Sequence, residues 1–171
     1  MSNNIILIGF MGCGKTTFGK WIAKNKKMKF VDTDEIIEKN EQCTINEIFK
    51  NRGEEVFRNM ETEVIKKLLD TAENSVISAG GGLPVKHINR GLLKELGTVV
   101  YLRTPKEELV KRLLNDTSRP LLKGGNIEQK IDTLMSLRKD IYEETADIII
   151  DTTDREFDKM YELIRQRESS K

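Results

Sequence analysis

The sequence has few of the residues that build metal centres and disulfide frameworks. It contains two cysteines, Cys13 and Cys43, and one histidine, His87, among 171 residues. The cysteines form no CxxC pair, which argues against a zinc site of Cys and His and rules out a disulfide scaffold. Such usage predicts a cytoplasmic protein.

The chain also lacks an excess of charge and a long apolar run. Its 29 basic and 28 acidic residues leave a net charge of +1, so it is not built to coat nucleic acid or an anionic membrane. The apolar stretch from Ile5 to Met11 is too short to span a bilayer, and no basic residue precedes it as in a signal peptide. We expect neither kind of partner.

Proline is scarce, and no repeat or linker divides the chain. The three prolines, Pro84, Pro105 and Pro120, do not cluster. This length predicts a single domain over residues 1–171. Without a heptad pattern or a repeat, a monomer is the default expectation.

Five short apolar runs are present instead. They are continuous and rich in β-branched residues, which is typical of strands buried on both faces in a parallel sheet. The runs are Ile5–Ile8, Phe30–Val31, Val76–Ile77, Val99–Leu102 and Ile148–Ile150.

Helical patterns lie between these runs. Phe18, Trp21 and Ile22 share the i, i+3, i+4 spacing of a packed helix face. Thr104–Glu107, with proline as the first helical residue, and Thr44–Glu47 both match a capping box. Strands that alternate with helices predict an α/β fold whose parallel sheet is covered on both sides.

The segment from Gly9 to Thr16 is the most specific motif. It matches G-x-x-x-x-G-K-[ST] between an expected strand and an expected helix, and chance gives about 0.01 matches in a chain of this composition. Its glycines let backbone N–H groups cradle phosphates at a helix N-terminus. Lys15 would reach the terminal phosphates, Thr16 would ligate Mg²⁺, and Cys13 would contribute only its amide.

Carboxylates follow two of the expected strands. Asp32 comes directly after Phe30–Val31, where open α/β sheets place ligands; it can serve a metal ion or cap the next helix. Asp151 follows Ile148–Ile150 and competes for the metal role. Asp34, one step further along, can face the hydroxyl group of a molecule that accepts the phosphate.

Further candidates have a plain structural interpretation beside the functional one. Arg58 and Glu61 have the i, i+3 spacing of a surface ion pair. Gly80–Gly82 is either a flexible turn or a place where a ligand approaches the backbone closely. Arg138, taken alone, would be a solvated charge.

The segment from residue 115 to 126 is polar and contains two glycines between two expected helices. It is either an ordinary exposed loop or a mobile lid that carries Arg119 to the phosphates.

Together these motifs resemble the shikimate kinases, a family of nucleoside-monophosphate-kinase-like P-loop proteins. The resemblance implies a three-layer P-loop fold with a five-stranded parallel sheet of order 2-3-1-4-5 and helices on both faces. It also implies an acceptor-binding region at about residues 33–61 and a lid at about 115–126. The matching positions are the phosphate loop, Asp32 and Asp34, Phe57, Arg58 and Glu61, Gly80–Gly82, Arg119–Leu122, and Arg138 with Tyr142.

The resemblance implies an ATP-dependent kinase that uses Mg²⁺ and phosphorylates the 3-hydroxyl of shikimate, in the route to chorismate and the aromatic amino acids. On the acceptor side, it implies that Asp34 contacts the ring hydroxyls of shikimate and acts as a base or as the group that orients the reacting hydroxyl. Arg58 and Arg138 hold the carboxylate, Glu61 orients Arg58, and the backbone of Gly80, Gly81 and Gly82 contacts the substrate.

On the nucleotide side, the resemblance makes Arg112 the residue that covers adenine and puts Arg155 in the adenine loop. Thr16 and, through water, Asp32 serve the metal. Lys15, Asp34 and Arg119 form the catalytic group. The expected ATP-binding residues are Gly12, Cys13, Gly14, Lys15, Thr16, Thr17, Arg112, Arg119 and Arg155.

Two other functions stay open at this point. One is a kinase for gluconate or a nucleoside monophosphate. The paired arginines with Asp34 favour a carboxylated polyol over a nucleotide, and the resemblance argues against gluconate. The other is a catalytically silent nucleotide-binding module, against which the presence of Lys15, Asp34 and Arg119 argues.

Overall fold

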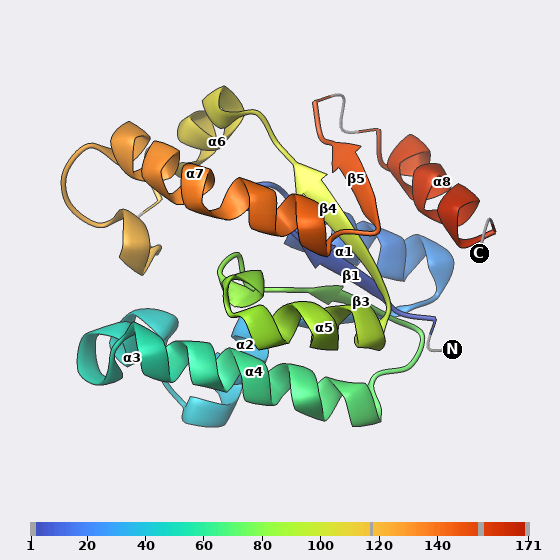
Figure 1. Cartoon of the computed structure of the whole chain (residues 1–171), viewed down its shortest axis with the longest axis horizontal. Helices are drawn as coiled ribbons and strands as arrows, with labels where there is room; N and C mark the ends of the chain where they lie inside the picture. Colours follow the sequence, from blue (N-terminus) through green and yellow to red (C-terminus); the bar gives the residue numbers. More distant parts are fainter. Residues whose placement is uncertain (1–2, 117, 154–155, 170–171) are drawn as a thin grey trace.

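Five parallel strands form the centre of the computed structural model, which describes residues 3–116, 118–153 and 156–169. Their order is β2-β3-β1-β4-β5, as the family resemblance implied, and each predicted apolar run lies in one of them (Figure 1). The strands are β1 (Ile5–Ile8), β2 (Lys29–Asp32), β3 (Ser75–Ser78), β4 (Thr98–Arg103) and β5 (Ile148–Asp151).

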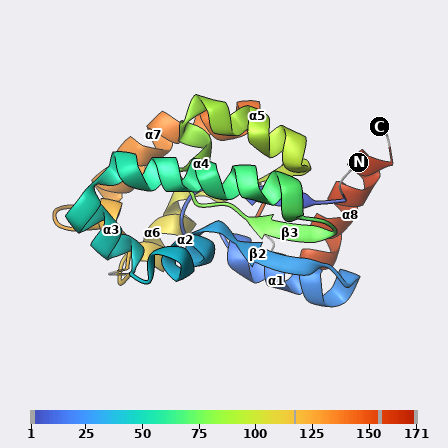
Figure 2. The same cartoon turned by 90° about the horizontal axis from the view of Figure 1, so that it is seen from below.

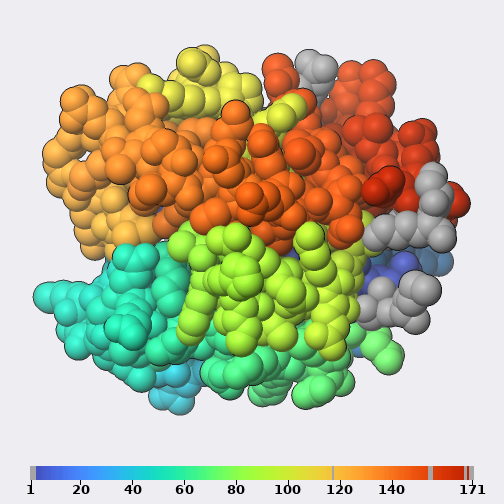
Figure 3. All heavy atoms as spheres, in the orientation of Figure 1, coloured from blue at the N-terminus to red at the C-terminus, as the bar shows by residue number. Residues whose placement is uncertain are grey.

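Helices cover both faces of the sheet. Figure 2 shows α1 and α8 on one face, and α4, α5 and α7 on the other. In the space-filling view α5 and α7 lie side by side, although they are far apart in sequence (Figure 3). The helices are α1 (Lys15–Lys26), α2 (Thr33–Glu41), α3 (Ile45–Arg52), α4 (Glu54–Thr71), α5 (His87–Leu96), α6 (Lys106–Leu113), α7 (Ile127–Thr145) and α8 (Phe157–Glu168), with 3₁₀ turns η1 (Leu83–Val85) and η2 (Pro120–Leu122).

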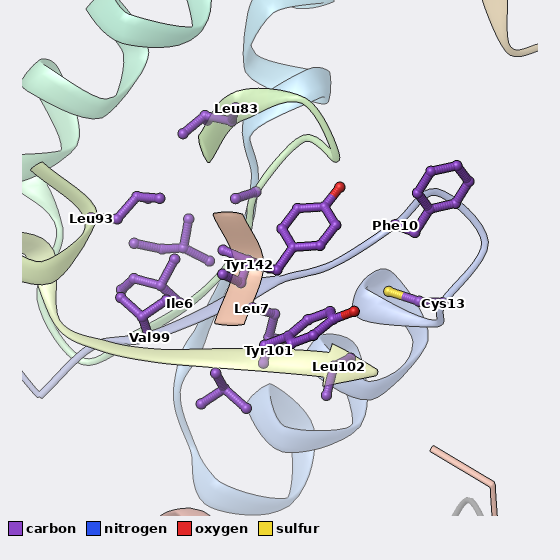
Figure 4. Close-up of a cluster of buried hydrophobic side chains, with 14 of the residues drawn as sticks. Ile6, Leu7, Phe10, Cys13, Leu83, Leu93, Val99, Tyr101, Leu102 and Tyr142 are labelled. Carbon is purple, nitrogen blue, oxygen red and sulfur yellow. The ribbon is translucent and has the colours of Figure 1, made fainter. Parts of the chain in front are cut away.

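The core lies on both sides of the three central strands. All residues of β1 and β3 are buried, and so are the four middle residues of β4. Figure 4 shows part of this core around Ile6, Leu7 and Tyr142. The edge strands β2 and β5 are only partly buried, because each has a neighbour on one side alone. Burial on both faces therefore holds for the centre of the sheet and not for its edges.

One of the two predicted capping boxes is confirmed. At the start of α3, the Glu47 amide donates to Thr44 Oγ1 over 3.3 Å and the Thr44 amide donates to Glu47 Oε2 over 2.8 Å. The other prediction is wrong, because Pro105 is the N-cap of α6 and no side chain caps that helix. Thr104 is buried and its hydroxyl hydrogen-bonds the Thr152 hydroxyl over 2.6 Å. A buried partner for a buried hydroxyl outweighs a local cap.

The carboxyl ends of β1, β2 and β3 meet at one edge of the sheet. Leu7 pairs in register with Ser78, and Ser78 pairs with Asp32. The phosphate loop, the start of α2 and the glycines after β3 therefore lie together. No helix in the described part of the chain has the length and apolar character needed to cross a membrane.

Candidate active site

The loop between β1 and α1 depends on its glycines. Gly9, Gly12 and Gly14 have φ of 142°, 78° and 101°, values that favour glycine strongly. A β-carbon at Gly9 would also lie 2.8 Å from the Leu102 carbonyl oxygen. The Cys13 side chain is buried and its sulfur points toward Tyr101 and Tyr142 (Figure 4). The sulfur also lies 3.7 Å from Lys15 Nζ, and a contribution of the Cys13 amide alone to phosphate binding stays a prediction.

Lys15 begins α1 and its side chain folds back over the loop. Its Nζ donates to the carbonyl oxygens of Gly9 over 2.9 Å and Phe10 over 3.1 Å. The ammonium is mostly buried and borders the adjoining cavity. This arrangement holds one positive charge at the mouth of the phosphate loop.

A cavity of about 590 Å³ adjoins the loop, within the size range of small-molecule sites. It brings together most of the residues that the sequence singled out. Among the predicted site residues, its walls include Gly12, Gly14, Lys15, Thr16, Thr17, Asp32, Asp34, Arg58, Glu61, Gly80, Gly81, Gly82, Arg119 and Arg138.

Asp32 caps α2 and also contacts the phosphate loop, while its metal role stays a prediction. Its Oδ1 accepts the amide hydrogens of Asp34 over 3.0 Å and Glu35 over 3.4 Å, which caps α2. Its Oδ2 accepts the Thr16 hydroxyl over 3.2 Å. One carboxylate therefore starts the helix and faces the phosphate loop.

Asp151, the competing carboxylate, lies elsewhere. Arg103 holds it through Nε over 2.6 Å and Nη2 over 2.8 Å, and its side chain is 60% exposed. The Arg103 hydrogen bonds lower the pKa of Asp151. Asp151 sits on the edge strand β5 and does not line the cavity, so the structure does not support it as the metal carboxylate.

Asp34 lies in the first turn of α2 and faces the cavity. Burial, and next the charge of Asp32, raise its pKa to about 6, against the opposing charges of Lys15, Arg119 and Arg58. Among the described residues its Oδ1 has no hydrogen-bond partner. A carboxylate with this pKa and a free acceptor atom can receive a hydrogen bond or a proton near neutral pH.

Arg58 and Glu61 are not a plain surface pair. Glu61 is fully buried and its Oε2 accepts Arg58 Nη1 over 2.7 Å. Glu54 accepts from the same guanidinium through Nη2 over 2.8 Å. Burial raises the pKa of Glu61 to about 7, although Arg58 lowers it. Two carboxylates thus orient Arg58 along the cavity wall.

Side chains of the site crowd the Gly80–Gly82 segment. A β-carbon at Gly80 would lie 2.6 Å from Asp34 Oδ1 and 2.7 Å from Glu61 Oε1. The Gly80 amide donates to Thr33 Oγ1 over 2.9 Å, a contact that no sequence motif indicated. These contacts fix the segment, so it is not a free turn.

Arg138 is buried rather than solvated. It is 5% exposed, and its Nη1 lies 3.5 Å from the Gly81 carbonyl oxygen. The Tyr142 hydroxyl, one helical turn later on α7, donates to the same oxygen. Tyr142 thereby ties α7 to the glycine segment, and only the family resemblance pointed to it.

The predicted lid segment borders the same cavity through Arg119, Pro120 and Leu121. Asp116 accepts the Ser118 amide over 2.8 Å and Arg119 Nε over 3.3 Å. The segment is therefore shaped by its own polar contacts, and its mobility stays a prediction.

The predicted adenine contacts are only partly described. Arg112 on α6 donates from Nη1 to the Gly12 carbonyl oxygen over 2.8 Å, so it braces the phosphate loop. Arg155 lies outside the described residues. The predicted contacts of Arg112 and Arg155 with adenine therefore stay predictions.

The comparisons with known proteins point to one family. The family model described as shikimate kinase matches residues 11–167. The chain belongs to the shikimate kinase family. A shikimate kinase of Francisella tularensis subsp. holarctica is 41% identical over 151 residues, which are 88% of this chain and 86% of that protein.

Solved structures of shikimate kinases share the fold. The shikimate kinase from Acinetobacter baumannii in complex with shikimate has a TM-score of 0.92 and 38% identity, over 97% of this chain and 94% of that one. The shikimate kinase from Aquifex aeolicus vf5 has a TM-score of 0.81 and 34% identity, over 95% and 96%. The protein is accordingly an ATP-dependent kinase, as predicted, and the silent-module and gluconate alternatives are set aside.

The oxygen atoms near the loop suit the magnesium that such kinases use with ATP. No group of three or more His, Cys, Asp or Glu side chains in the described ranges could hold a metal ion alone. Mg²⁺ commonly takes one or two protein oxygens beside substrate phosphates and waters. The Thr16 hydroxyl and the Asp32 carboxylate, 3.2 Å apart, fit an ion that arrives with the nucleotide.

Proposed function

We propose that the protein transfers the γ-phosphoryl group of ATP to the 3-hydroxyl of shikimate, giving shikimate 3-phosphate and ADP. This step belongs to chorismate and aromatic amino-acid biosynthesis. The observation that carries the proposal is the placement of Arg58, Arg138 and Asp34 around one cavity with the phosphate loop. The complex of the Acinetobacter baumannii relative with shikimate supports it.

The acceptor end of the cavity suits a carboxylated polyol. Arg58 and Arg138 would hold the carboxylate, because guanidinium groups give it paired, directional hydrogen bonds. Glu61 keeps Arg58 in place through the 2.7 Å contact. The backbone of Gly80, Gly81 and Gly82, which lines the cavity, would contact the substrate.

Asp34 would act on the reacting hydroxyl. With a pKa of about 6 it is ionised at neutral pH and still basic enough to take the proton as transfer proceeds. Phosphoryl transfer has a loose transition state and needs positioning and charge stabilisation above all. Alignment of the hydroxyl and late acceptance of its proton are therefore sufficient.

The nucleotide end would supply positive charge. Lys15 and the amides of Gly12, Cys13 and Gly14 would bind the phosphates, with Thr16 and Thr17 at the helix start. Arg119 would reach the transferring phosphoryl group from the lid. Thr16 directly, and Asp32 through water, would hold Mg²⁺, which would neutralise phosphate charge. Arg112 and Arg155 would border adenine.

We take the chain to act as one P-loop kinase domain over residues 1–171, with a lid at about 115–126 that closes over both substrates. ATP as co-substrate favours action in the cytoplasm. We propose a monomer, because the sequence has no heptad pattern and no internal repeat.

The test is ADP release from Mg²⁺-ATP with shikimate, against gluconate, AMP and CMP as matched acceptors. Among the four acceptors, we expect ADP release only with shikimate, and we expect that release to stop when Mg²⁺ is chelated. ³¹P NMR of the product should show a phosphomonoester at the 3-position. Equal or faster release with gluconate or a nucleoside monophosphate would overturn the acceptor assignment and leave the kinase fold in place.

A further inference from the structure

Asn46 links the acceptor-binding region to the lid segment. It lies in the first turn of α3, and its Nδ2 donates to the Ser118 carbonyl oxygen over 3.0 Å, across 72 residues of sequence. That carbonyl belongs to the peptide bond that leads into Arg119. The side chain therefore contacts the backbone from which Arg119 projects.

The lid side of this contact is ordered by Asp116. Its carboxylate accepts the Ser118 amide over 2.8 Å and the Ser118 hydroxyl over 2.5 Å, and it also accepts Arg119 Nε over 3.3 Å. Ser118 is thus held through its N–H and hydroxyl by Asp116 and through its carbonyl by Asn46. Both contacts act on the peptide that leads into Arg119.

The acceptor side of the contact is equally fixed. The Thr44–Glu47 capping box anchors the start of α3, and the Ile45 amide donates to Glu38 Oε1 over 2.9 Å. Ile45 and Phe49 of the same helix line the cavity beside Asn46. The amide of Asn46 is therefore mounted on an anchored helix that the acceptor itself would touch.

The Asn46 amide does not serve its own helix. Asparagine near a helix start usually bonds nearby backbone, yet the contact of Asn46 goes to the lid. Its Oδ1 is buried without a hydrogen-bond partner among the described residues. Because Thr44 already caps the helix, the Asn46 side chain is free to make its contact with the Ser118 carbonyl oxygen.

We propose that Asn46 is a positioning residue that orients the Ser118–Arg119 peptide and so couples the acceptor-binding helix to the lid arginine. The proposal rests on the proposed role of Arg119 at the transferring phosphoryl group. Asn46 touches the lid and not the carboxylate-binding arginines, so its loss acts on kcat more than on the KM for shikimate.

The main experiment compares Asn46→Ala and the nearly isosteric Asn46→Asp, which removes the N–H donor, with Asn51→Ala. Asn51 is an exposed asparagine on the same helix. We expect kcat to fall about 3- to 10-fold in both Asn46 variants, the size of one neutral hydrogen bond, with the KM for shikimate changed less than about 2-fold. The Asn51 variant should match the wild type. Equal kcat in Asn46→Ala and Asn51→Ala would overturn the proposal.

An Arg119→Ala background separates positioning from a general structural role. If Asn46 acts through Arg119, adding Asn46→Ala to Arg119→Ala should not lower kcat further. An equal fold-reduction of kcat in the wild-type and Arg119→Ala backgrounds would overturn the inference. Full activity of Arg119→Ala alone would remove the proposed role of Arg119, and the lid contact would then be judged by trypsin cleavage after Lys123. Faster cleavage in Asn46→Ala than in Asn51→Ala supports the contact, and equal rates refute it.

Discussion

The guanidinium of Arg58 occupies the space that a side chain at position 82 would need. A β-carbon on Gly82 would lie 2.2 Å from Arg58 Nη1 and 2.4 Å from Cζ. Gly82 has an ordinary φ of −97°, so the constraint at this position is the room that Arg58 takes up and not backbone conformation. The glycine segment after β3 is thus shaped by the side chains that bind the acceptor.

We predict that Gly82→Ala displaces Arg58 and raises the KM for shikimate about 10-fold or more, with a smaller change in the KM for ATP. Loss of part of a charged hydrogen-bonding site costs roughly 1.5–3 kcal/mol. Steady-state kinetics with each substrate varied in turn measures the split.

Gly91→Ala is the matched control. A β-carbon at Gly91, inside α5, meets no atom within 4 Å. Helix propensity predicts a stability gain of about 0.5–1 kcal/mol with unchanged kinetics. If both alanine variants keep the wild-type KM for shikimate, the crowding of Arg58 has no functional consequence.

Asp34 predicts an acidic limit to activity. Since its pKa is raised to about 6, first by burial and then by Asp32, kcat/KM for shikimate should fall about 10-fold per pH unit below that value as the carboxylate is protonated. Asp32→Asn removes a charge that raises this pKa, so the limit should move to lower pH. Profiles of both proteins at saturating Mg²⁺-ATP would show the shift, and a limit that stays in place would exclude Asp34 as its source.

The Asp34 carboxylate is expected to serve activity at neutral pH while lowering the stability of the fold. The folded state binds the Asp34 proton more tightly than the unfolded chain does, so the stability it confers is present below pH 3.8 and is lost as the pH rises to about 6. At pH 7 the buried charge destabilises the fold. Asp34→Asn should therefore abolish most turnover yet raise the free energy of unfolding at pH 7, on the order of 1–3 kcal/mol.

Urea unfolding of Asp34→Asn and wild type at pH 7 and pH 4.5 measures this effect. The advantage of the variant should shrink at the lower pH, where Asp34 in the wild type is protonated as well. A variant that is less stable than the wild type at pH 7 would show that the Asp34 carboxylate stabilises the fold.

The strands and the phosphate loop were predictable because each is indicated by one short stretch of sequence. Continuous β-branched runs marked all five strands, although only the central ones are buried on both faces. The fixed spacing from Gly9 to Thr16 predicts the phosphate loop by itself. The Thr44–Glu47 cap is also local, and it formed. Where one short segment contains all the partners and no distant group competes for them, the sequence is sufficient.

Other features depend on partners far along the chain. Arg58 and Glu61 have the same spacing whether the pair is solvated or buried, and only the packed fold buries Glu61 fully. Asn46 contacts a carbonyl 72 residues away, and Thr104 bonds a hydroxyl 48 residues away. No local preference encodes such pairs, which is why a cap was predicted at Thr104 and Asn46 was missed.

Asp32 and Asp151 give opposite predictions for magnesium. Asp32→Asn should raise the Mg²⁺ concentration needed for half-maximal activity several-fold, because its Oδ2 lies 3.2 Å from the Thr16 hydroxyl. Asp151→Asn breaks the pair with Arg103 at the far edge of the sheet and should leave that concentration unchanged. Mg²⁺ titrations at fixed ATP decide between them, and a larger effect of Asp151→Asn would return the metal role to that residue.

The hydroxyls of Thr104 and Thr152 predict an energetic coupling between two loops that follow neighbouring strands. Both residues are buried, and Thr104 also donates to the Cys13 carbonyl oxygen over 3.4 Å. Valine at either position removes one partner of a buried hydrogen bond, at a cost of roughly 1–3 kcal/mol. Valine at both positions should cost less than the sum, by about 1 kcal/mol. Urea unfolding of the single and double variants measures this coupling. If Thr104 instead acted as a helix cap, the two losses would be independent and would simply add.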